Sequence, residues 1–156
     1  MHNYEARVSW SRGAAEKFTD GRFSRAHQWA FDGGVTVKAS ASPSVVPLPL
    51  SAADAVDPEE ALVASTSSCH MLYFLFFAAR RGFIVDSYVD NAFGVLEKNA
   101  AGKMVMSRIT LRPRIVISGD KRPSVDDFLS LHHSAHDECF IANSLKTEIV
   151  VEPVLE

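Results

Sequence analysis

The stretch of residues 57–82 constrains the fold most, because it predicts one long helix that is apolar or small on nearly every side. Asp57 is a favourable N-cap, Pro58 suits the first helical position, and two glutamates follow at the positive end of the helix dipole. The run continues until two arginines and Gly82 signal a C-terminus. A helix of this kind needs cover on several sides, so we expect it at the centre of the fold.

Shorter elements surround this helix. Ser124 with Asp127 resembles a capping box and predicts a second helix that ends near Glu138. Alternating apolar residues and turn signals predict strands over residues 4–10, 22–31, 35–41, 84–96, 103–117 and 146–154, with hairpin turns at 32–34 and 99–102. This order predicts an α+β fold, a single domain over residues 1–156 with antiparallel sheets packed around two central helices.

Composition narrows the class of protein. The chain has 156 residues, 47% hydrophobic residues, 22% charged residues and a net charge of -3. These values are ordinary for a globular protein and argue against nucleic acid as a partner. Residues 61–79 approach the length of a membrane span, but serines, Thr66 and His70 interrupt them, which favours a buried helix. No secretory signal is visible, so we expect a cytoplasmic protein without a membrane partner.

The chain has two cysteines, Cys69 inside the long predicted helix and Cys139 just after the second. In a reducing cytoplasm, two cysteines more often do redox chemistry than cross-link the fold. The alternative is that each is a small buried hydrophobic residue, which is the commoner role of a lone cysteine in an apolar helix. The neighbours of Cys69 in sequence are mostly neutral, so any group that activates its thiol must come through the fold.

Two segments carry a family resemblance. Asp57-Pro58-Glu59-Glu60 begins a helix with a cysteine ten residues after the first glutamate, and a second cysteine lies late in the chain in His136-Asp137-Glu138-Cys139. This pattern, extending from about Tyr4 to Val151, resembles the family of osmotically inducible protein C and the organic hydroperoxide resistance proteins (OsmC/Ohr). His70 and Phe140 stand where the better-known branches usually have Phe and Pro, so the chain resembles a divergent branch.

The resemblance implies an intertwined homodimer that acts as a thiol-dependent peroxidase on organic hydroperoxides or hydrogen peroxide. Cys69 would attack the peroxide and Cys139 would resolve the sulfenic acid as a disulfide. An arginine from the N-terminal strands, oriented by Glu59, would hold Cys69 as a thiolate. The resemblance implies no cofactor, and a dithiol or a protein as the reductant.

Arg25 and Arg22 are the candidates for that arginine. If residues 22–31 form one strand, Arg25 shares a face with aromatic side chains, whereas Arg22 lies on the opposite face. A guanidinium on an aromatic face needs a partner, which favours Arg25. His27 on the same face could assist, or it could be a core histidine.

Helix geometry constrains the role of Glu59. Glu59 and Cys69 are ten residues apart, or roughly 15 Å along a helix axis. The carboxylate therefore cannot reach Cys69 of its own chain, and a partner chain would have to supply it. The alternative is that Glu59 only improves the helix terminus.

A metal site is a further alternative. His132 and His136 are four residues apart, with Cys139 three further on, and Cys69 could complete a tetrahedral set. Zinc would block a peroxide-reactive thiolate, and two histidines on an exposed helix face are usually just solvated. We therefore expect no metal, and keep a zinc-binding dimer and a non-enzymatic small-ligand-binding protein as alternatives to the peroxidase.

Overall fold

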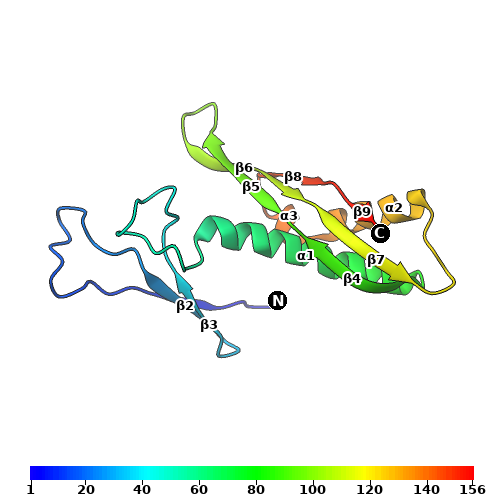
Figure 1. Ribbon diagram of the computed structural model, residues 1–156, viewed down its shortest axis with the longest axis horizontal. Helices are drawn as coiled ribbons and strands as arrows, with labels where there is room; N and C mark the ends of the chain where they lie inside the picture. The colour runs from blue at the N-terminus through cyan, green and yellow to red at the C-terminus, as the bar shows by residue number, and fades with distance from the viewer. The chain divides into compact units, whose positions relative to one another are not determined.

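The computed structural model describes residues 1–156 as two compact units, Met1–Ala61 and Leu62–Glu156 (Figure 1). The first unit contains a three-stranded antiparallel sheet in the order β1-β2-β3. Its strands are β1 (Ala6–Ser9), β2 (His27–Phe31) and β3 (Thr36–Ala39). The turn between β2 and β3 is the predicted one, and Gly34 has a φ of 81°, a backbone conformation that favours glycine.

The strand predicted over residues 22–31 is shorter, because it begins only at His27. The preceding residues form a loop that is held by the carboxylate of Glu16. That carboxylate accepts hydrogen bonds from the backbone N–H groups of Ser24 at 2.7 Å and Gly13 at 2.9 Å. Backbone groups bonded to a side chain in this way are not available for a sheet. The prediction that Arg25 and Arg22 lie on opposite faces of a strand is therefore wrong, because neither residue is in a strand.

Helix α1 (Pro58–Arg80) has the predicted ends. At its start, Asp57 Oδ1 accepts a hydrogen bond from the N–H of Glu60 at 2.8 Å, and the Glu60 carboxylate accepts one from the N–H of Asp57 at 3.3 Å. At its end, Gly82 adopts a φ of 77° and Phe83 N–H donates to the carbonyl of Ala78. The N-cap at Asp57 and the glycine C-cap are the predicted ones, and the capping box that Glu60 completes was not predicted.

The second unit contains two mixed sheets, in the orders β4-β7-β9 and β5-β6-β8. Its remaining elements are β4 (Ile84–Asp90), β5 (Phe93–Lys98), β6 (Met104–Leu111), β7 (Pro113–Ser118), α2 (Val125–Glu138), α3 (Phe140–Asn143), β8 (Glu148–Val151) and β9 (Val154–Leu155). The predicted hairpin has its turn at Asn99, but its strands belong to two sheets. β5 pairs with β6 in one sheet, and β4 pairs with β7 in the other. At the division Asp90 Oδ1 accepts from the N–H of Arg112 at 2.6 Å, and Pro113 has no N–H to continue the ladder.

The α+β fold is the predicted one, but two strand pairs depart from the antiparallel sheets that the sequence predicts. β8 pairs with β6 and β9 pairs with β7, both in parallel. The chain re-enters the sheets after α2 and α3, running in the same direction as the strand beside it. Pro153 interrupts the predicted final strand and divides it into β8 and β9, one for each sheet.

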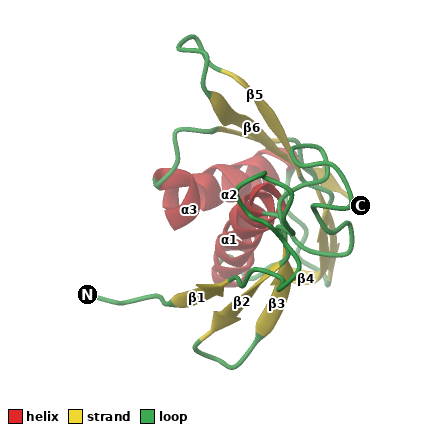
Figure 2. Ribbon diagram, turned by 90° about the vertical axis from the view of Figure 1, so that its left-hand side faces the viewer, coloured by secondary structure: helices red, strands yellow, loops and turns green.

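The core of the second unit lies between α1, α2 and the sheet that contains β7. The helices gather together beside the strands (Figure 2). α1 contributes one row of buried residues spaced four apart, Thr66, His70, Phe74 and Ala78. By length and composition α1 could also cross a membrane, and only 22% of its most apolar window is buried within the chain. Leu72 and Phe76 are 61% and 50% exposed, so part of this apolar helix lacks cover within one chain.

Candidate thiol site

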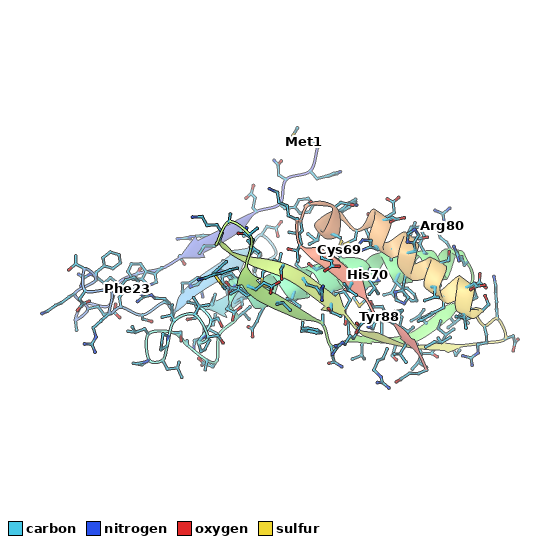
Figure 3. The ribbon with its side chains drawn as sticks, turned by 90° about the horizontal axis from the view of Figure 1, so that it is seen from above. Met1, Phe23, Cys69, His70, Arg80 and Tyr88 are labelled. Atoms are coloured by element: carbon cyan, nitrogen blue, oxygen red, sulfur yellow. The ribbon has the colours of Figure 1, made fainter.

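The two cysteines lie together although they are far apart in the sequence. Cys69 is partly exposed in the middle of α1, beside His70 (Figure 3). Cys139 is buried at the junction of two helices, where it is both the C-cap of α2 and the N-cap of α3. Both thiols are free, and the Cys69 side chain is close enough to Cys139 to influence its ionisation. The structure therefore brings together the pair that the sequence predicts for redox chemistry.

The surroundings of Cys139 favour its protonated form. Burial, followed by the neighbouring Cys69 side chain, raises the pKa of Cys139 to about 11. Ala142 N–H donates to Cys139 Sγ at 3.4 Å, which acts in the opposite direction but is weaker. The buried surroundings of Cys139 therefore keep this residue as a thiol.

A histidine pair lies next to the thiols. His70 Nε2 and His132 Nδ1 are 3.0 Å apart, and the two ring planes differ by only 8°. His70 is 1% exposed and His132 is 4% exposed. His132 lies between Phe74, with ring centroids 4.4 Å apart, and Phe128, at 4.8 Å. The expectation that His132 is solvated on an exposed helix face is therefore wrong. His132 is buried, and the exposed histidine is its neighbour His133.

Burial keeps both imidazoles neutral. It lowers the pKa of His70 to about 4, with the charge of His136 as a smaller cause. It lowers the pKa of His132 to about 3, with His70 as the smaller cause. Each ring of the pair uses one nitrogen, while His70 Nδ1 and His132 Nε2 are buried without a hydrogen-bond partner.

The side chains considered for zinc are not arranged around a common point. No group of three or more histidine, cysteine or acidic side chains is placed to hold a metal ion. The Nδ1 atom of His132 is bonded to His70 instead. The alternative of a zinc-binding dimer therefore gains no support from these residues.

Arg25 belongs to the first unit and contacts an aromatic ring, as expected, but from a loop. Its guanidinium carbon lies 3.7 Å from the centroid of the Phe23 ring. Its Nη1 donates to the carbonyls of Gly21, at 2.9 Å, and Phe23. The Nε and Nη2 groups make no hydrogen bond within the chain, so they are free to bind an anion. Arg22, the other candidate, is exposed.

Glu59 also belongs to the first unit, at the start of α1. The capping box uses Glu60, and the half-buried carboxylate of Glu59 has no hydrogen bond or ion pair in the chain. A carboxylate without a hydrogen bond still favours the positive end of the helix dipole, so the alternative that Glu59 only improves the helix terminus stands beside the site role. His27, considered as an assistant, is bonded to the carbonyl of Arg25 at 2.8 Å and to the indole N–H of Trp29 at 3.0 Å.

Two features of the site were missed by sequence reasoning. The short helix α3, which makes Cys139 a helix cap, has too few residues to give a periodic signal. Of the His70–His132 bond, only the burial of His70 had a signal in the sequence. His70 falls in the four-residue repeat of Thr66, Phe74 and Ala78 that α1 buries, and this spacing predicts an inward-facing imidazole.

Comparison with known proteins identifies the family. The family model of OsmC-like proteins matches residues 51–154. The structure of an OsmC-like protein of unknown function from Vibrio cholerae is 52% identical, covers 99% of this chain and 100% of that chain, and has a TM-score of 0.97. A search of curated proteins found no match.

More distant structures share the fold alone. An OsmC-like protein from Mycoplasma pneumoniae is 15% identical, covers 99% of this chain and 97% of its own, and has a TM-score of 0.73. An organic hydroperoxide resistance protein of Bacillus subtilis is 14% identical, covers 99% of this chain and 98% of its own, and has a TM-score of 0.65. Together with the family-model match, these likenesses confirm the resemblance seen in the sequence, and the chain belongs to the OsmC-like family.

Proposed function

We propose that the protein is a two-cysteine peroxidase that reduces organic hydroperoxides or hydrogen peroxide in the cytoplasm. The observation that carries this proposal is the pair of free thiols that lie near each other, one partly exposed and one buried. A partly exposed thiolate can meet a substrate, while a buried thiol beside it can resolve the product. The name of the Bacillus subtilis neighbour gives the same substrate class for a protein of this fold.

The proposed reaction has two steps. In the first, the Cys69 thiolate attacks the distal oxygen of the peroxide, the O–O bond breaks, and the departing alkoxide takes a proton to become an alcohol. In the second, Cys139 sulfur attacks the sulfenic acid of Cys69, an S–S bond forms, and water leaves. A dithiol or a protein reductant then returns both cysteines to thiols. All electrons come from sulfur, so no metal or organic cofactor is needed.

Arg25 and Glu59 complete the proposed site. The free Nε and Nη2 donors of Arg25 would hold the Cys69 thiolate and the incoming peroxide oxygen, and the guanidinium stays charged at any working pH. The unpaired carboxylate of Glu59 would orient Arg25 by an ion pair. Because ten residues of helix separate Glu59 from Cys69, we propose that Glu59 acts on the site of a second copy.

We further propose a homodimer, in which a second copy covers the exposed side of α1. Leu72 and Phe76 are large apolar side chains left exposed on this helix.

Sedimentation at micromolar concentration is expected to give twice the mass of one chain. Mixing the inactive variants Cys69→Ser and Glu59→Gln is then expected to restore part of the activity, since one of the two mixed sites has both residues. A monodisperse monomer would contradict the dimer and the shared site.

Intact mass after one equivalent of an organic hydroperoxide tests the chemistry. The reduced protein is expected to lose about 2 Da, the two hydrogens removed when a disulfide forms. The Cys139→Ser variant is expected instead to gain about 16 Da, because the sulfenic acid then has no resolving thiol. An unchanged mass of the wild-type protein would overturn the proposed function.

A further inference from the structure

Few direct bonds hold α2 against α1, and they lie along the length of α2. Arg81, just beyond the end of α1, donates to Ser130 Oγ at 3.0 Å and lies 3.8 Å from Asp127 Oδ1 in the first turn of α2. In the middle, His70 and His132 share their 3.0 Å hydrogen bond. Directly after the end of α2, Cys139 lies near the Cys69 side chain of α1. The histidine bond is the only hydrogen bond that connects a residue within α1 to one within α2.

The histidine bond is adjacent to the thiol pair on both helices. His70 directly follows Cys69 on α1. His132 precedes Cys139 by seven residues, which is close to two full helical turns, so both lie on the same face of α2. Fixing the rotation of α2 at His132 therefore also fixes the direction in which Cys139 points.

The pair is costly for stability. Two buried imidazoles share one hydrogen bond, and His70 Nδ1 and His132 Nε2 have no partner. A buried polar group without a partner destabilises a fold, whereas apolar groups of similar size in its place can be neutral or stabilising. The aromatic surroundings of His132, formed by Phe74 and Phe128, would accept such a replacement. What the pair supplies is a directional contact between the two helices.

We propose that His70 and His132 are positioning residues for disulfide formation, because their hydrogen bond holds Cys139 against Cys69. This deepens the proposed function, since the disulfide is its resolving step. A disulfide forms only when the two Cα atoms are within about 7 Å and the side chains point toward each other. A small rotation of α2 would break that condition without unfolding the protein.

The experiment measures how readily the two thiols pair without peroxide. Wild type and variants are equilibrated with mixtures of reduced and oxidised glutathione, and the fraction of Cys69–Cys139 disulfide gives the effective concentration of the thiols. In the double variant His70→Phe/His132→Phe this concentration is expected to fall by about tenfold or more, because the thiols lose their mutual orientation. The thermal midpoint of the reduced double variant is expected to equal or exceed that of the wild type.

Two single variants serve as controls. In His132→Asn the side-chain amide can bond to His70 from nearly the place of Nδ1, so the effective concentration is expected to stay near the wild-type value. His133→Phe changes the exposed neighbour on the same helix and is expected to have no effect.

An unchanged effective concentration in the double variant would overturn the proposal. So would an unfolded double variant, because the pair would then be needed for folding and not only for position. Glutathione replaces peroxide here as the oxidant, so this result is independent of the mass measurement. A protein that pairs its thiols in glutathione but ignores peroxide would refute the proposed function and leave the positioning role intact.

Discussion

Replacing Cys69 with serine is expected to lower the rate of peroxide reduction by about a thousandfold or more, because a serine hydroxyl is not ionised and is a poor nucleophile toward the O–O bond. Cys69 is the partly exposed member of the thiol pair, whereas Cys139 is buried and favours its protonated form. The measurement is consumption of an organic hydroperoxide in the presence of a small dithiol. Ser68→Ala, which changes an exposed neighbour on α1, is the matched control and should keep full activity.

The same assay distinguishes the roles of the two cysteines. Cys139→Ser is expected to consume one equivalent of peroxide at the wild-type rate, since the attacking thiolate is intact. Its turnover then depends on whether the dithiol can attack the sulfenic acid directly. If Cys139→Ser lost the first oxidation and Cys69→Ser kept it, the two roles would be reversed.

The sequence predicted those parts of the fold that rest on local signals. The ends of α1 depend on local residues. Asp57 and Glu60 bond backbone N–H groups at the start of the helix, and Gly82 adopts the positive φ that ends it. The capping box at Ser124 likewise predicted the start of α2. The parallel pairing of β8 and β9 was missed, because strand direction depends on where the chain returns after α2 and α3 and not on any local pattern.

The same contrast holds in the site. Cys69 and Cys139 were found through spacing that recurs in a family, and they do lie together. The loop conformation of Arg25 was not predictable by strand alternation, since the carboxylate of Glu16 bonds the backbone N–H of Ser24, which a strand would need. The bond between His70 and His132 spans 62 residues of sequence, and nothing local connects the two rings.

The resolving step is expected to accelerate with pH, by about tenfold for each unit and so about a hundredfold between pH 7 and pH 9. The attacking species is the Cys139 thiolate. Burial first, then the neighbouring Cys69 side chain, raises the pKa of Cys139 to about 11. At pH values below this pKa, the ionised fraction of Cys139 rises tenfold per pH unit. Burial persists after Cys69 is oxidised, so the slope should remain. Single-turnover kinetics with one equivalent of peroxide measures disulfide formation as the phase that follows sulfenic acid formation.

The pH dependence also reveals whether Cys139 ionises on its own. Substituting the buried histidines should slow disulfide formation at every pH and leave its slope unchanged, because they act on the position of the thiol and not on its proton. A resolving rate that is flat between pH 7 and pH 9 would contradict free ionisation. A neighbouring base would then remove the proton during attack, and His136, whose buried Nδ1 has no partner and which precedes Cys139 by one helical turn, would be the residue to replace next.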